Sequence, residues 1–199
     1  MKCDTYDEGM RWITARHKFL FLRKYTAVFW GAFDPPTEAH YAIIDAVLAH
    51  RKVHDLIVVV NNHSYKNYMF PLMTRLQQLE RVCLAKKKVR CMWQDDQNPC
   101  GVHQLKQLTR SPLCAVAGYD AYQQWLKSGC VSRDRGLYQA IAVVPRGNEE
   151  PILFDDHAFL LGIGVRYRYV SSTLLRTSCV SNMLDSACMP ASDLNASIK

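Results

Sequence analysis

Short runs of apolar residues alternate along the chain with longer stretches in which apolar residues recur at helical spacing. Continuous apolar runs of about four to eight residues are typical of strands that are buried on both faces of a parallel sheet. Such runs predict strands at residues 25–31, 56–61, 113–118 and 140–145, with weaker candidates at 89–93 and 165–170.

The stretches between these runs carry apolar residues three or four positions apart, as in amphipathic helices. They predict helices at residues 38–49, 74–87, 102–108 and 121–127. Strands that alternate with helices form βαβ units with right-handed crossovers. The pattern therefore predicts an α/β fold with a doubly wound, mostly parallel sheet.

One domain accommodates this pattern, because 199 residues are enough for a continuous core. We expect the domain to span residues 25–180, with an N-terminal extension at 1–24 and a C-terminal tail at 181–199. In an open parallel sheet, ligands bind beyond the carboxyl ends of the strands. The residues that directly follow the strands are therefore the candidates for function.

Composition narrows the class of protein. Apolar residues make up 49% of the chain and charged residues 22%, which is typical of a globular protein, and no apolar stretch has the ~20 residues that a membrane span needs. The eight cysteines include no Cys-x-x-Cys pair, and the N-terminal residues lack the apolar core of a signal peptide. We expect reduced thiols in a cytoplasmic protein, rather than a zinc site or a disulfide framework.

The net charge of +7 indicates an anionic partner, either nucleic acid or a phosphorylated small molecule. The basic triplet at 86–88 closes a predicted helix, where cations favour the helix dipole. We therefore expect small phosphorylated substrates, and not nucleic acid, as the partners. The sequence leaves open whether the chain forms a homo-oligomer.

The turn after the first predicted strand, GAFDPPTEAH, has the residues of a phosphate site. Gly31 allows the backbone to approach a ligand closely or to take a conformation barred to other residues, and two prolines stiffen the loop. Thr37 stands at a natural N-cap, where a helix presents unpaired N–H groups to an anion. His40, one turn later, can donate a hydrogen bond to an oxyanion. A satisfied histidine in an ordinary capped helix is the alternative.

A Ser-Ser-Thr segment follows the last predicted strand. Ser171 and Ser172 are capping residues ahead of a short helix, and Arg176 falls one turn into it. The hydroxyl and N–H groups can hold one phosphate and the guanidinium another. An ordinary serine-capped helix with a surface arginine is the alternative.

Together, these two segments resemble the signatures of the nucleotidylyltransferase superfamily, which contains the nicotinate and nicotinamide mononucleotide adenylyltransferases and phosphopantetheine adenylyltransferase. GAFDPPTEAH is similar to G-x-F-x-P-x-[HT]-x-x-H, and VSSTLLR is similar to I-S-S-T-x-x-R. The resemblance implies a Rossmann-like fold in which Thr37 and His40 contact the α-phosphate of ATP. It further implies that ATP is bound by Gly31, Ala32, Phe33, Ser171, Ser172, Thr173 and Arg176.

The loop after the second predicted strand carries a basic residue in this superfamily. The resemblance implies that this residue reaches the phosphates, and Lys66 is the candidate by position. His63 is a rival for the same role. The Glu80-Arg81 pair on the next helix also matches the superfamily pattern.

Two further segments are similar to the mononucleotide branch. AVAGYD resembles its G-x-D segment, which implies that Gly118 lies against the adenosine and that Asp120 binds a ribose hydroxyl. Asp120 could equally cap its own helix. Trp125 could pack on a pyridine ring or in the core. VVPRG resembles the V-x-R-x-G strand end, which directs Arg146 toward the nucleotide substrate.

The resemblance implies that MgATP and a phosphomonoester give a dinucleotide-like product and pyrophosphate. Such chemistry requires positioning and charge stabilisation and no protein nucleophile. Mg²⁺ would be held largely by the phosphates, so we expect no metal ligands from the protein.

The VVPRG strand end favours nicotinate or nicotinamide mononucleotide as the acceptor. At the [HT] position of the signature, Thr37 is the residue typical of phosphopantetheine adenylyltransferases. The S-Y-T-x-D-T-L segment of the mononucleotide branch has no counterpart in this chain. Phosphopantetheine is thus the second candidate acceptor, and a cytidylyltransferase is the third candidate activity. A non-catalytic module that binds nucleotide or nucleic acid is the alternative class.

Overall fold

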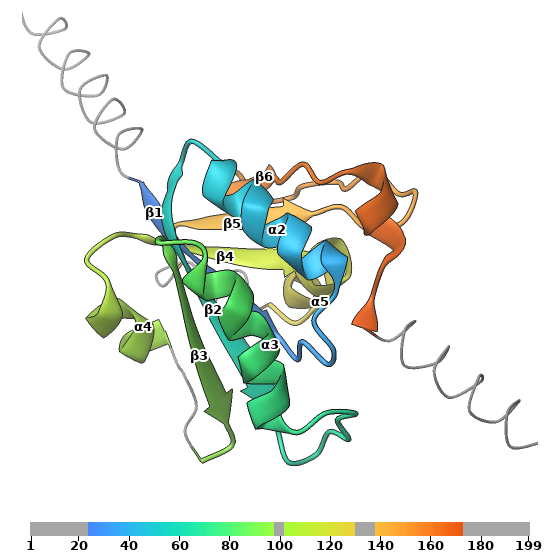
Figure 1. Cartoon of the computed structure of the whole chain (residues 1–199). Helices are drawn as coiled ribbons and strands as arrows, with labels where there is room; N and C mark the ends of the chain where they lie inside the picture. Colours follow the sequence, from blue (N-terminus) through green and yellow to red (C-terminus); the bar gives the residue numbers. More distant parts are fainter. Residues whose placement is uncertain (1–23, 98–101, 130–137, 173–199) are drawn as a thin grey trace, which may run out of the picture.

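The computed structural model describes residues 24–97, 102–129 and 138–172. A six-stranded sheet forms its centre in the order β3-β2-β1-β4-β5-β6, and every neighbouring pair of strands is parallel (Figure 1). This architecture confirms the predicted α/β fold. The strands are β1 (Tyr25–Gly31), β2 (Val53–Asn62), β3 (Val89–Asp95), β4 (Leu113–Gly118), β5 (Ala140–Val144) and β6 (Ala158–Leu160).

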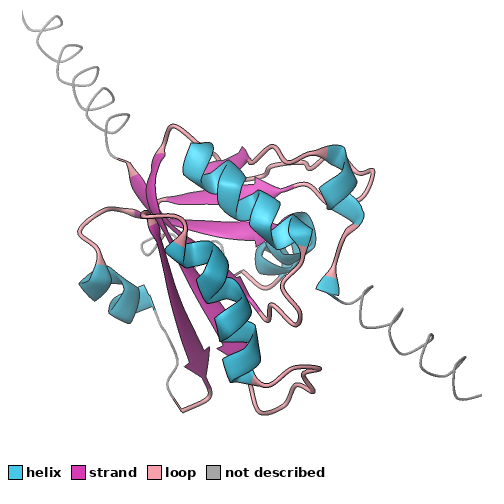
Figure 2. Ribbon diagram, viewed as in Figure 1, coloured by secondary structure: helices cyan, strands magenta, loops and turns pink. Residues whose placement is uncertain are grey.

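Helices cover both faces of the sheet (Figure 2). Ala27 and Phe29 of β1 pack in the core cluster that includes residues of α2 and α3, whereas Val28 packs in a cluster with α4 on the other face. Alternate residues of a strand point to opposite faces, so a strand covered on both sides is apolar throughout. The helices are α2 (Glu38–Ala49), α3 (Leu72–Leu84), α4 (Val102–Leu108) and α5 (Tyr119–Lys127).

The strand predicted at 165–170 is wrong. This segment forms a 3₁₀ helix, η1 (Val165–Tyr169), in which the Tyr167 N–H donates to the Gly164 carbonyl at 2.9 Å. None of its residues is buried, and the segment lies outside the sheet, where it contacts α2. The sixth strand is β6, whose three residues at the edge of the sheet are too few to give an apolar pattern.

Several predicted boundaries shift by two or three residues. β2 begins at Val53, α3 runs from Leu72 to Leu84, and α5 begins at Tyr119. The lysine triplet at 86–88 therefore follows α3 instead of closing it, and Lys86 forms an ion pair with Asp45 of α2 at 2.5 Å. That lysine joins two helices of the same layer.

The predicted N-terminal extension, apart from residue 24, and the predicted C-terminal tail lie outside the described residues. So do Thr173 and Arg176 of the second motif. Within the described part of the chain, no helix has both the length and the apolar character to cross a membrane.

Candidate active site

The candidate site lies where the strand order of the sheet reverses. β1 pairs with β2 on one side and with β4 on the other. The chain leaves β1 for α2 on one face and leaves β4 for α5 on the opposite face (Figure 1). A crevice between diverging loops is the position at which open parallel sheets bind ligands.

The loop after β1 is shaped by the packing of Phe33. A Cβ atom on Gly31 would lie 2.9 Å from Cε2 of Phe33, so a larger residue at position 31 would collide with this ring. Of the two roles suggested for Gly31, the left-handed backbone conformation is found at Phe33 instead, whose φ is +48°. Phe33 is buried and packs edge-on against Phe29, with 5.3 Å between ring centroids. Gly31 thus makes room for the aromatic ring that fixes the loop.

Thr37 and His40 form a reciprocal cap at the start of α2. The His40 N–H donates to Oγ1 of Thr37 at 3.4 Å, and Nδ1 of His40 accepts from the Thr37 N–H at 3.0 Å. Oγ1 of Thr37 also lies 2.8 Å from Nδ1. Because Nδ1 accepts from a backbone N–H, the proton of the neutral imidazole is assigned to Nε2. Thr37 is the predicted N-cap, and its contact with a phosphate stays a prediction.

The imidazole of His40 is kept neutral by its surroundings. Its ring centroid lies 4.9 Å from that of Phe33 and 6.1 Å from that of Phe29. Desolvation, and then the positive charge of Arg146, lower the pKa of His40 from 6.5 to about 4. At neutral pH, His40 is therefore a neutral hydrogen-bond donor through Nε2.

Arg146 follows β5 and passes over the end of β4. A Cβ atom on Gly118 would lie 3.0 Å from Nε of Arg146, so the glycine leaves room for this side chain. Its positive charge contributes to the lowered pKa of His40. The structure thus brings together residues from the ends of β1, β4 and β5.

The structure decides between some of the roles predicted for two residues of α5, Asp120 and Trp125. The N-cap of α5 is Gly118, without a side-chain cap, so the suggested capping role of Asp120 is wrong. Asp120 is exposed in the first turn, where a carboxylate favours the helix dipole, and its contact with a ribose stays a prediction. Trp125 packs against the core cluster that contains Tyr119 and Tyr122, as one of its two interpretations predicted.

The second motif docks directly on the first. Oγ of Ser172 donates to the Pro35 carbonyl at 2.8 Å, across 137 positions of the chain. Figure 1 shows this end of the described chain, in orange, beside the start of α2. Ser171, the preceding residue, also interacts with another group of the protein. The phosphate-binding roles of both serines stay predictions, but the two motifs meet at one edge of the sheet.

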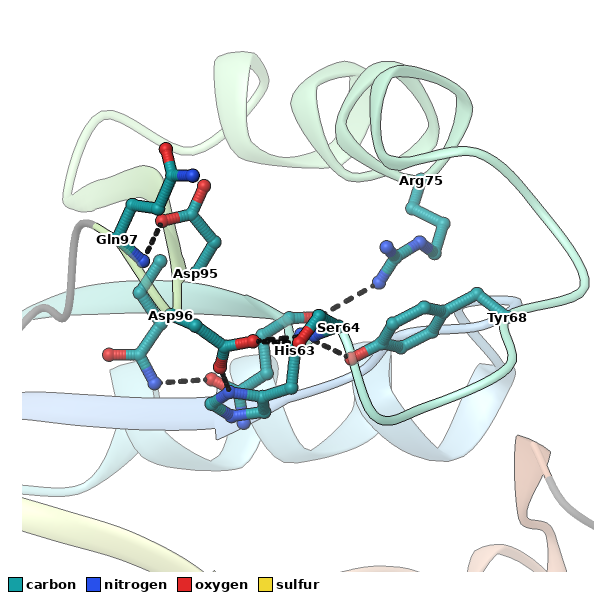
Figure 3. Close-up of polar contacts among 9 residues, drawn as sticks. His63, Ser64, Tyr68, Arg75, Asp95, Asp96 and Gln97 are labelled. Carbon is teal, nitrogen blue, oxygen red and sulfur yellow. Dashed lines mark hydrogen bonds and ion pairs between the residues drawn. The ribbon is translucent and has the colours of Figure 1, made fainter.

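The loop between β2 and α3 holds both candidates for the basic residue. Lys66 is exposed, with Nζ 5.6 Å from the ring centroid of Tyr65. Nδ1 of His63 lies 2.9 Å from Oδ1 of Asp96, which follows β3 (Figure 3). Nδ1 of His63 therefore has an anionic partner from the protein, and which of the two residues reaches a phosphate stays a prediction.

Sequence reasoning missed a buried arginine at the base of this loop. Arg75 of α3 is fully buried, and its guanidinium lies 4.0 Å from the ring centroid of Tyr68 (Figure 3). Desolvation lowers the pKa of Arg75, whereas the nearby Asp34 carboxylate raises it. The guanidinium donates four hydrogen bonds of 2.5–3.1 Å to oxygens of Ala32, Asn61, Asn62 and Phe70.

A sequence signal for Arg75 does exist. It shares the apolar face of α3 with Leu79 and Cys83, at the spacing of successive helical turns. A cation on such a face is buried and must be paired. The nearby buried carboxylate of Asp34 carried no comparable pattern.

The described residues contain no group of three or more His, Cys, Asp or Glu side chains that could hold a metal ion.

A family model described as cytidylyltransferase-like matches residues 28–178, which is more than half of the chain. The chain belongs to the cytidylyltransferase-like family. This membership confirms the predicted nucleotidylyltransferase superfamily and the prediction that the chain is a nucleotidyltransferase. No curated protein sequence matches the chain significantly.

Two solved structures are similar to this family member in fold. Plasmodium falciparum nicotinic acid mononucleotide adenylyltransferase complexed with NaAD is 17% identical, with a TM-score of 0.57 over 77% of this chain and 83% of that chain. The same enzyme complexed with APC is also 17% identical, with a TM-score of 0.55 and the same coverage. At this identity, the likeness establishes the Rossmann-like nucleotidylyltransferase fold.

The first prediction concerns Arg75. Arg75→Met should lower the free energy of unfolding by about 3 kcal/mol, because it leaves buried carbonyl oxygens without donors. Arg81→Met, on an exposed position of the same helix, should change it by less than about 0.5 kcal/mol. Urea unfolding of the two variants measures this difference. Equal stabilities would show that the buried guanidinium does not hold the loop.

The second prediction concerns pH. Because the pKa of His40 falls from 6.5 to about 4 on folding, the folded protein binds fewer protons than the unfolded chain between these values. The stability contributed by His40 is thus complete above pH 6.5 and is lost as the pH falls toward 4. Urea unfolding across this range should show a weaker pH dependence for His40→Gln than for the wild type. Parallel curves would contradict the lowered pKa.

Proposed function

We propose that the chain transfers AMP from MgATP to a phosphomonoester acceptor, nicotinate or nicotinamide mononucleotide, with release of pyrophosphate. The observation that carries the proposal is the hydrogen bond from Ser172 to the Pro35 carbonyl. This bond joins the two motifs at the point where the strand order of the sheet reverses. Taken singly, each motif could be an ordinary capped helix. Two adjacent sites for phosphates are what transfer of a nucleotidyl group requires.

In the proposed reaction, an oxygen of the acceptor phosphate attacks the α-phosphorus of ATP. The bond from that phosphorus to the β-bridging oxygen breaks, and pyrophosphate leaves with the electron pair. His40 donates a hydrogen bond from Nε2 to a non-bridging oxygen of the α-phosphate as charge moves across it. A neutral donor suits this role because no proton has to be transferred.

Cationic side chains beyond the carboxyl ends of the strands would bind the other phosphates. Arg146, beside Gly118 at the end of β4, would bind the acceptor phosphate, whereas Lys66 would reach the β- and γ-phosphates. Mg²⁺ enters as part of MgATP, where it neutralises phosphate charge. The net charge of +7 suits two polyanionic substrates. The free thiols of Cys83, Cys91 and Cys114 suit the proposed cytoplasmic location.

The choice of acceptor rests on the strand end that carries Arg146 and on the fold shared with a nicotinic acid mononucleotide adenylyltransferase. Thr37 favours phosphopantetheine as the second candidate. The family description also requires CTP to be tested as the nucleotide donor.

A competition assay tests the proposal. The protein is mixed with MgATP and equal amounts of nicotinate mononucleotide, nicotinamide mononucleotide and phosphopantetheine, and the products are identified by mass. A dinucleotide and pyrophosphate are expected. Dephospho-coenzyme A would establish the second candidate, and a product that forms only when CTP replaces ATP would establish a cytidylyltransferase. Untouched nucleotide in both mixtures would overturn the proposal.

His40→Ala should lower turnover by about 10²-fold or more, the scale for loss of one transition-state donor. His54→Ala, at an exposed position of β2, should keep wild-type turnover. Far-UV circular dichroism establishes that both variants are folded. Equal turnover of the His40 variant and the wild type would remove His40 from the mechanism.

A further inference from the structure

The loop between β2 and α3 is held at both ends by carboxylates from other parts of the chain. At its far end, the N–H groups of Met69 and Phe70 donate to Asp34 at 2.7 and 2.8 Å. At its near end, His63 and Ser64 bind Asp96 (Figure 3). The segment between these two anchors contains Lys66.

Asp96 makes a dense set of contacts for an exposed side chain. Its carboxylate accepts from the Ser64 N–H at 2.7 Å, from Oγ of Ser64 at 2.5 Å and from Nδ1 of His63 at 2.9 Å. The bonds from Ser64 and then from His63 lower the pKa of Asp96 to about 2, so the carboxylate is ionised at neutral pH. Figure 3 shows all three residues converging at the ends of β2 and β3.

A continuous series of contacts leads from Asp96 to the ammonium group of Lys66. The imidazole of His63 is bound to Asp96 and stacks on the ring of Tyr65, with 5.1 Å between centroids and 19° between planes. Nζ of Lys66 lies 5.6 Å from the centroid of the same Tyr65 ring. A tyrosine ring is a favourable surface for a cation at this distance.

The Tyr65 side chain is 74% exposed, so no core packing holds its ring in place. Its stacking partner His63 is fixed by Asp96 on one side, and the His63 N–H donates to the Tyr68 hydroxyl at 2.9 Å. The orientation of the stack is thus decided at His63.

We propose that Asp96 is a positioning residue: through Ser64 and the His63–Tyr65 stack, it presents Lys66 to the triphosphate of the nucleotide. The inference rests on the proposed function, because it takes Lys66 as a ligand of the phosphates. Asp96 itself does not contact the nucleotide, and its effect passes through the loop.

Simple electrostatics predicts the opposite effect of Asp96 on triphosphate binding. Asp96 is an anion at the edge of the sheet that would bind a polyanion, so removal of its charge alone should strengthen triphosphate binding. If Asp96 instead positions Lys66, removal of the Asp96 carboxylate should weaken triphosphate binding. Asp95 provides the matched control, because it is the adjacent carboxylate and accepts from the Gln97 N–H in its own turn (Figure 3).

A double-mutant cycle in the full chain tests the inference. Asp96→Ala, Lys66→Ala and the double variant are titrated with MgATP by calorimetry without acceptor, with Asp95→Ala as the control for charge. KM for ATP and kcat are measured for the same proteins with the acceptor found in the competition assay. Thermal unfolding shows whether each variant is folded.

Lys66→Ala should raise the dissociation constant of MgATP by about 10-fold, as expected for loss of a hydrogen bond to a charged group. Asp96→Ala should raise it by about 5-fold, yet by less than about 2-fold in the Lys66→Ala background, because residues that act as a unit are not additive. Asp95→Ala should leave the constant unchanged or lower it. KM should follow these constants, with a smaller change in kcat.

An equal effect of Asp96→Ala in both backgrounds, or tighter binding, would overturn the inference. If Asp96→Ala fails to fold, Ser64→Ala replaces it in the cycle, because it removes one donor to Asp96 and leaves the charge.

Failure of the proposed function gives a different result. If the wild type binds MgATP but adenylylates no acceptor, the proposed reaction is wrong, and the binding cycle still decides the role of Asp96. If the wild type does not bind MgATP, both proposals fail.

Discussion

A single buried guanidinium joins the segments from which the candidate active site is built. Arg75 binds backbone oxygens at the ends of β1 and β2 and in the loop that leads to α3. Ala32 and Phe70 lie outside the strands, and Asn61 follows the last residue of β2 that pairs with β1, so their carbonyls need a donor from elsewhere. Asp34 complements this arrangement, because it accepts N–H groups of the same loop. The first motif and the loop that carries Lys66 are therefore fixed relative to each other before any substrate binds.

The chemistry of the site depends on this fixed geometry. Phosphoryl transfer asks a protein for positioned donors and cations, and no covalent intermediate is needed. His40 is held by the cap of its own helix and by the ring of Phe33, so its Nε2 proton has a defined direction. Desolvation, and then the charge of Arg146, lower its pKa. His40 lies in the first turn of α2 and Arg146 in the loop after β5, both beyond the carboxyl ends of strands, so their relative positions follow from the strand order.

Local patterns were sufficient for most of the fold and for the cap at the start of α2. Five of the six predicted strands, including the weaker candidate at 89–93, and all four predicted helices are present, because apolar runs and helical periodicity report burial directly. The pairing of Thr37 with His40 was also predictable, since a helix cap spans only three residues. The segment at 165–170 imitated a strand, because alternation of apolar residues carries no information on whether a second layer covers them.

The sequence by itself thus determined the α/β fold, the position of both motifs and the membership of a nucleotidyltransferase family. Only the tertiary structure decided which distant residues meet: Arg75 with the first loop, Asp96 with His63, and Ser172 with Pro35. It also showed that Gly31 and Gly118 make room for protein side chains. The physical reason is separation along the chain. Burial and capping are encoded within a few neighbouring residues, whereas these contacts join distant residues and depend on the order of the parallel strands.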